Sequence, residues 1–60
     1  MSSKPEKILI GHKLKRLRQS LRISQLEMAQ EINISPSYLN LLENNQRPIT
    51  VNLLFKLGQL

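Results

Sequence analysis

The sequence predicts an all-α fold, a compact bundle of four short helices, or five if the domain is complete. Apolar residues recur at spacings of three and four, the period of a helix with one buried face. Residues that can cap a helix precede three of the apolar segments. No segment alternates apolar and polar residues in the manner of a half-buried strand.

The first helix is expected to start near Ile10 and to run to about Arg22. Its apolar stripe has spacings of four, three and four, and consists of Ile10, Leu14, Leu17 and Leu21. Most basic residues lie off this stripe, so the helix is amphipathic. The preceding "MSSKPEK" is polar and contains a proline. We therefore expect a flexible basic leader over residues 1–8 and a folded domain over residues 9–60.

The segment "SQLEMAQEI" predicts a second, short helix. Ser24 followed three positions later by Glu27 is the pattern of a capping box. The expected buried side consists of Met28, Ala29 and Ile32. Asn33 should end this helix, because asparagine tolerates a positive φ better than most residues.

A third helix should follow almost at once, since Ser35 can cap it and Pro36 fits a first turn. Leu39 and Leu42 are three apart and share its core face. The short connection forces a sharp turn between the second and third helices. A short helix, a tight turn and another short helix form the helix-turn-helix pattern, whose second helix lies in the DNA major groove.

The third helix is expected to end at Asn44 and Asn45, which tolerate the left-handed conformation that closes helices. Thr50 then caps a fourth helix, whose apolar face consists of Leu53, Leu54 and Leu57. The sequence stops shortly afterwards, at Leu60. Apolar residues without an evident partner indicate that the domain is truncated at this end, or that a dimer partner covers them.

Charge is distributed unevenly along the chain, whose net charge is +5. Residues 1–22 carry seven lysines and arginines against one glutamate, whereas residues 23–60 carry two against three. A basic first half indicates a polyanionic partner, although a merely solvated basic face would look the same. With no cysteine, no signal peptide and no apolar run long enough to span a bilayer, we expect a cytoplasmic protein without disulfides.

The stretch "IGHKLKRLRQSLRISQLEMAQEINISPSYLNLLENNQRPIT" resembles the lambda-repressor-like helix-turn-helix domains of the XRE and Cro family, over about residues 10–60. The most specific elements are "LKRLR", "SQLEMA" and "SPSYLNLLEN", in this order and spacing. "SPSYLNLLENNQRPIT" further resembles a subgroup of longer bacterial regulators associated with short-chain fatty acid metabolism, which carry a C-terminal effector domain.

This resemblance implies a sequence-specific DNA-binding domain of a bacterial or phage transcriptional regulator, such as a repressor. The recognition helix would be about residues 36–44 and would enter the major groove of double-stranded DNA. The domain would act as a homodimer on two half-sites about one helical turn apart. A small-molecule effector would bind a C-terminal domain that the sequence lacks.

The resemblance also implies which residues contact DNA phosphates. Gln25 matches a position that contacts a phosphate and braces the recognition helix; the alternative is a solvent-exposed glutamine. Asn44 and Arg47 match backbone-contact positions, and Asn44 could equally be a helix cap. With no lysine or arginine on the recognition helix, the basic first helix would contribute as well, through Lys13 and Arg16. Lys4 and Lys7 could form an arm along the duplex or a disordered tail.

Base contacts are expected from Pro36, Ser37, Tyr38, Asn40 and Leu41. Phage repressors often have a glutamine where Pro36 stands, and proline cannot pair with adenine as glutamine does. Ser37 discriminates weakly between bases. Leu41 would fit a thymine methyl group, unless it packs in the core. Tyr38 and Asn40 remain open: the tyrosine could instead pack onto the second helix, and the asparagine could hold water.

Arg18 and Glu43 match positions that form a buried ion pair between the first and third helices in such repressors. This resemblance assigns them to the fold rather than to DNA contact. Replacing Glu43 alone should therefore destabilise the domain strongly, since Arg18 would lose its partner.

An enzyme is not expected, because His12 is the single histidine and no acidic neighbour orients it. No cofactor and no metal are predicted. The alternative function is a protein-interaction module of the antitoxin or adaptor kind, in which Tyr38 and Leu41 would anchor a protein partner. A third possibility is nonspecific nucleic-acid binding through the basic half alone.

Overall fold

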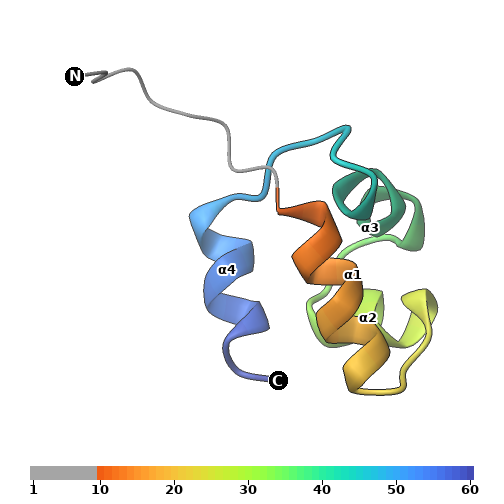
Figure 1. The fold of residues 1–60 in the computed structure, drawn as a ribbon. Helices are drawn as coiled ribbons and strands as arrows, with labels where there is room; N and C mark the ends of the chain where they lie inside the picture. Colours follow the sequence, from red (N-terminus) through yellow and green to blue (C-terminus); the bar gives the residue numbers. More distant parts are fainter. Residues whose placement is uncertain (1–9) are drawn as a thin grey trace.

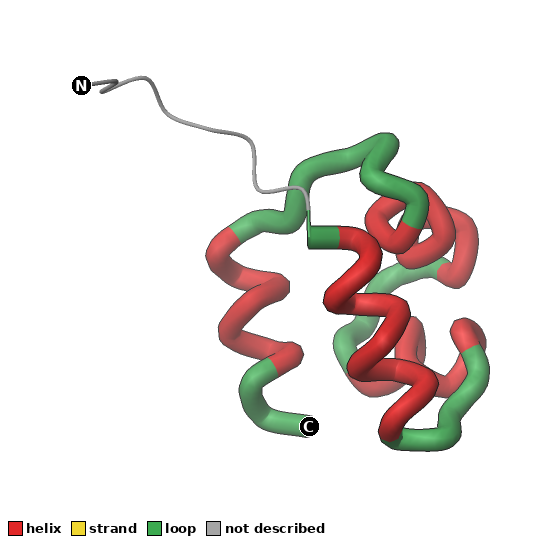
Figure 2. The backbone as a smooth tube through the Cα atoms, in the orientation of Figure 1, coloured by secondary structure: helices red, strands yellow, loops and turns green. Residues whose placement is uncertain are grey.

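Four helices joined by short connections make up the computed structural model, which describes residues 10–60 (Figures 1 and 2). In chain order they are α1 (Gly11–Ser20), α2 (Gln25–Glu31), α3 (Pro36–Glu43) and α4 (Val51–Leu57). This part of the chain contains no strand, so the predicted all-α fold is confirmed. The proposed leader, with Lys4 and Lys7, lies outside the described residues.

Three helices begin with a side-chain cap supplied by the residue just before them, as the sequence predicts. The Ser24 hydroxyl accepts the N–H of Glu27 at 3.0 Å, and the Glu27 carboxylate accepts the Ser24 N–H at 2.8 Å, which completes the capping box of α2. Ser35 caps α3 and Thr50 caps α4 in the same way, each three residues before its donor.

Left-handed residues end the first three helices or the turns that follow them. Asn33 and Asn45 adopt φ values of 61° and 60°, as expected of asparagine, whereas Asn44 does not. Arg22 has a φ of 59°, and the chain turns at Leu21 and Arg22. The prediction that the first helix runs to about Arg22 is therefore wrong by two residues, because a left-handed residue cannot continue a right-handed helix.

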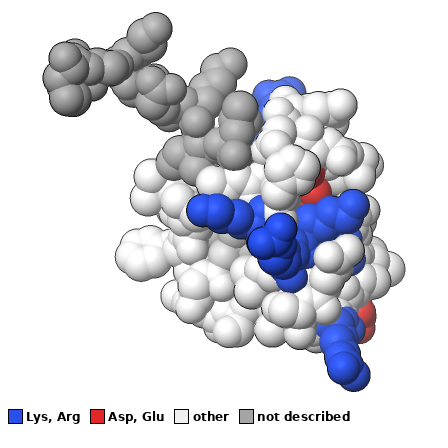
Figure 3. Space-filling view, viewed as in Figure 1, with Lys and Arg blue, Asp and Glu red and all other residues white. Residues whose placement is uncertain are grey.

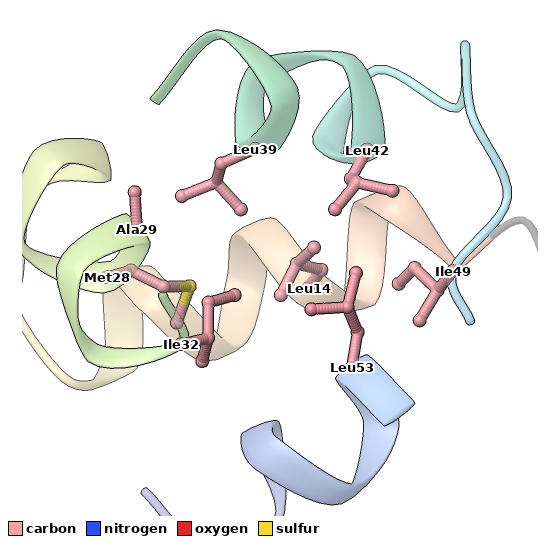
Figure 4. Packing of buried hydrophobic residues seen from close by; sticks show 8 residues of the cluster. All are labelled: Leu14, Met28, Ala29, Ile32, Leu39, Leu42, Ile49 and Leu53. Atoms are coloured by element: carbon pink, nitrogen blue, oxygen red, sulfur yellow. The ribbon is translucent and has the colours of Figure 1, made fainter. Parts of the chain in front are cut away.

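The core lies where α3 packs against α1 and α2, with α4 placed against the other side of α1 (Figures 1 and 4). Its fully or almost fully buried members come from all four helices, from the residue that ends α2 and from the loop before α4: Leu14, Met28, Ala29, Ile32, Leu39, Leu42, Ile49 and Leu53. The positions predicted as buried on the second and third helices are all among them.

The apolar stripe of α1 is buried less than predicted. Leu14 is 2% exposed, but Leu17 and Leu21 keep 37% and 40% of their surface exposed. For Leu17 the reason is the placement of α4, which reaches the core through Leu53 and leaves an open apolar groove of about 220 Å³ beside α1. Leu21 lies beyond the end of α1, in the turn before α2. Across residues 10–60, none of the helices combines the length and apolar character needed to cross a membrane.

Candidate nucleic-acid interface

The connection between α2 and α3 is a tight turn closed by backbone contacts. The N–H of Ile34 donates to the carbonyl of Ala29 at 2.9 Å, and the left-handed Asn33 reverses the chain beside it. Ala29 is completely buried, and its side chain is a single methyl group. The two helices and their turn thus have the helix-turn-helix arrangement predicted from the spacing.

The α3 helix is braced by a glutamine at the start of α2. The Gln25 side-chain amide donates to Asn40 Oδ1 at 3.3 Å and to Glu43 Oε1 at 2.9 Å. Asn40 and Glu43 lie about one turn apart on α3, so one amide group fixes both the rotation and the position of that helix. Gln25 is half-buried, which excludes the alternative of a freely solvated glutamine.

Arg18 and Glu43 form an ion pair between α1 and α3. Arg18 Nε lies 2.6 Å from Glu43 Oε2, and Nη2 donates to Oε1 at 3.2 Å. The Glu43 side chain is only 2% exposed and that of Arg18 is 14% exposed. Arg18 Nη1 also donates to the carbonyl of Ile23, so the same guanidinium holds the loop that leads into α2.

Burial and hydrogen bonding act on Glu43 in opposite directions. Burial by itself would raise the pKa of this carboxyl, because it disfavours the charged form. The hydrogen bonds from Arg18 and Gln25, with the positive charges of Arg18 and Lys15, outweigh burial and hold the Glu43 pKa below its ordinary value. The lowered pKa favours the charged carboxylate in the native state. Its hydrogen bond with Arg18 raises the pKa of that guanidinium.

The predicted base-contact residues fall into two groups. Pro36, Ser37 and Asn40 are exposed along α3 and form a small polar surface. Leu41 is half-buried and lies outside the core cluster. Tyr38 is half-buried and packs against the core, which favours the packing alternative for its ring.

The predicted phosphate-contact residues are not all together. Asn44 caps the C-terminal end of α3 and is exposed, as is Arg47 in the following loop. Lys13 instead lines the apolar groove with Leu54 and Leu57 of α4, so the structure does not bring it to α3. Arg16 is exposed on the outer surface of α1. Figure 3 shows lysine and arginine side chains gathered over α1, from its α4 side towards its α3 side.

A contact that the sequence analysis missed joins the start of α1 to the end of α3. Gly11 is buried, and a Cβ atom placed on it would lie 2.5 Å from the carbonyl oxygens of Leu42 and Glu43. The Gly11 N–H donates to Asn45 Oδ1 at 2.7 Å. The signal available was a glycine at the start of a helix that has no capping residue of its own, since Ile10 precedes it.

A short helix with an exposed polar surface, braced across a tight turn by the helix before it, defines the helix-turn-helix class of DNA-binding domains. The sequence agrees with this class, because a family model described as helix-turn-helix matches residues 14–60. The chain belongs to this helix-turn-helix family, in its XRE-type form.

Curated bacterial relatives carry the same domain within much longer chains. The HTH-type transcriptional regulator PrpR of Mycobacterium tuberculosis is 49% identical over 49 residues, which cover 82% of this chain and 10% of the relative. RamB of the same species is 40% identical over 53 residues, covering 88% of this chain and 11% of the relative. The Propionyl-CoA carboxylase regulator of Cereibacter sphaeroides is 37% identical over 54 residues, covering 90% and 12%.

The chain thus spans about a tenth of the length of the curated relatives it matches. No solved structure matches it significantly.

Proposed function

We propose that this chain is the operator-reading domain of a bacterial transcriptional regulator, with α3 in the major groove of duplex DNA. The observation that carries the proposal is the bracing of α3 by Gln25, whose amide holds Asn40 and Glu43 from α2. A helix fixed in this way presents its exposed side chains to base edges in one register. Family membership supports the same assignment.

The exposed side chains of α3 define the proposed reading surface. Ser37 and Asn40 would hydrogen-bond base edges, and Leu41 would contact a thymine methyl group. Pro36 and Tyr38 would shape the surface, with the tyrosine hydroxyl reaching the duplex while its ring stays against the core. Gln25, Asn44 and Arg47 flank α3 and would contact phosphates. Lys13 and Arg16 would contribute mainly through the positive field of α1.

Two copies are proposed to act together on half-sites about one helical turn apart, since a single domain of this size reads few base pairs. One of the relatives is named a propionyl-CoA carboxylase regulator. The segment "SPSYLNLLENNQRPIT" resembles the bacterial regulators associated with short-chain fatty acid metabolism. We propose that the genes controlled belong to short-chain acyl-CoA metabolism, that a small-molecule effector acts on another part of the protein, and that regulation takes place in the cytoplasm.

The test is selection of duplexes from a random-sequence library by the 60-residue chain at low salt. An enriched sequence motif would support the proposal. Gln25→Ala should weaken binding to the selected duplex, whereas Gln30→Ala removes an exposed glutamine from the outer surface of the same helix and should not. Asn40→Ala should relax the selected sequence at one position. Failure to enrich any motif would overturn sequence-specific reading.

A second candidate function, a protein-interaction module, is favoured by one observation. Val51 and Phe55 of α4 are 71% and 73% exposed, and α1 and α4 also leave an apolar groove open between them. Analytical ultracentrifugation of the chain with and without the selected duplex separates the possibilities. Self-association on DNA supports the proposed dimer, and tight association without any DNA binding would favour the interaction module.

A further inference from the structure

Lys15 lies on the side of α1 that faces α3. It follows Gly11 by four residues and precedes Arg18 by three, which are the two spacings that place helical residues next to one another. Both of these neighbours touch α3: Gly11 packs against the carbonyl oxygens at its end, and Arg18 pairs with Glu43. Lys15 therefore projects from the side of α1 that packs against α3, its charge acts on Glu43 of that helix, and its side chain is exposed.

Lys15 makes no direct polar contact within the described residues, although its charge helps to lower the pKa of Glu43. Both oxygens of Glu43, the nearest anion that it acts on, already accept hydrogen bonds, from Arg18 and from Gln25. Within residues 10–60 the only ion pair is that of Arg18 with Glu43, and Lys15 donates no side-chain hydrogen bond there. A solvated ammonium group is thus held beside α3 without a protein partner.

The recognition helix needs such a cation from outside its own sequence. Residues Pro36–Glu43 contain no lysine or arginine, yet phosphate neutralisation supplies much of the affinity of a DNA-binding domain. Arg47 supplies one positive charge from the loop that follows α3. Lys15 stands beside α3 on a different element, so the two cations would reach phosphates from two separate parts of the fold.

We propose that Lys15 is the phosphate-contacting cation of α1. This inference rests on the proposed function and adds a residue to its interface. Lys13 carries the same charge on the same helix, but two helical positions rotate it about 200° away, and it lines the groove beside α4. The two lysines therefore form a matched pair, one beside the recognition helix and one away from it.

The experiment compares Lys15→Gln with Lys13→Gln in the 60-residue chain, with sonicated genomic duplex DNA as the probe over a series of salt concentrations. A direct phosphate contact contributes about 0.9 to the slope of log affinity against log salt concentration. Lys15→Gln should lose a slope of about this size, so that between 50 and 200 mM salt its affinity falls about threefold less than that of the wild type. Lys15→Arg should keep the wild-type slope.

The other possible outcomes would overturn the assignment of Lys15 or the proposed function. If the two glutamine variants lose equal slope, Lys15 acts only as part of a diffuse field and the assignment is overturned. If Lys15→Gln loses affinity but keeps the wild-type slope, its role is structural and the assignment again fails. Thermal melting of each variant supplies the check on folding. If the wild type binds no duplex even at low salt, the proposed function itself fails.

Discussion

The N–H of Gly11 and the side-chain oxygen of Asn45 are 2.7 Å apart, so a residue in the loop after α3 caps the first turn of α1. The contact satisfies a buried N–H group that no local residue can reach, since Ile10 has no capping side chain. The same loop carries Arg47. The start of α1 therefore fixes where the proposed phosphate-binding loop lies.

Replacing Gly11 with alanine should destabilise the domain. The added Cβ would lie 2.5 Å from two backbone oxygens, so α1 and α3 would have to move apart, at a cost of about 1–3 kcal/mol. Gly58→Ala is the matched control, because its Cβ would meet backbone atoms no closer than 3.5 Å. Urea unfolding of both variants measures the difference. Equal stabilities would contradict the close approach of the two helices.

Replacing Asn45 with glycine isolates the hydrogen bond to Gly11. Glycine keeps the left-handed backbone of this position, and only the side-chain acceptor is lost. Asn33→Gly is the control, since Asn33 has a φ of 61° and makes no side-chain hydrogen bond within the described residues. Asn45→Gly should be less stable than Asn33→Gly by about 1–3 kcal/mol, the cost of an unsatisfied buried N–H. Indistinguishable melting temperatures would show that water replaces the cap.

Removing the carboxylate of Glu43 should lower the stability of the domain more than removing any other side-chain carboxylate of the described residues. Glu43→Ala leaves Arg18 without its partner, and breaking such a pair costs about 3 kcal/mol or more. Glu31→Ala removes an exposed glutamate and should change stability little. In the double variant Arg18→Ala, Glu43→Ala the loss should be smaller than the sum of the two single losses. Additive losses would mean that the two side chains do not interact.

Stability should decrease in acid through Glu43. Its native pKa lies below the ordinary value of 4.5, so between the two values the unfolded chain binds more protons than the native one. The stabilisation is complete above about pH 5 and is lost as the pH falls through the native pKa. The difference in melting temperature between the wild type and Glu43→Gln should shrink as the pH falls from about 7 to about 3. A constant difference would contradict the lowered pKa.

Local signals made most of the fold predictable. Three helix starts were predicted from their capping residues, Ser24, Ser35 and Thr50, because a cap is a contact between residues three apart. Asn33 and Asn45 likewise mark left-handed positions from their own chemistry. Leu39 and Leu42 follow from helical spacing alone. Each of these features depends on residues that are close together in the sequence, so it can be predicted from a short segment.

Features that depend on contacts between helices were harder to predict. Spacing placed Leu17 and Leu21 on a buried stripe. The burial of Leu17 depends on where α4 lies, which no local pattern specifies, and Leu21 lies in the turn after α1. Likewise, composition showed that the first helix is basic, but it could not distinguish Lys13, beside α4, from the lysine beside α3. The Gly11–Asn45 contact was missed for the same reason, since it joins residues 34 positions apart.

The sequence separation between each helix start and its capping residue also indicates the order in which the helices form. The caps of α2, α3 and α4 close loops of three residues, so these helices can start as soon as their own segments collapse. The cap of α1 closes a loop that spans more than half of the chain. The first turn of α1 can therefore become complete only after α3 and its following loop have formed. Protection of the Gly11 amide against hydrogen exchange would thus report when α3 and the loop after it have formed, although Gly11 lies 34 positions before Asn45 in the sequence.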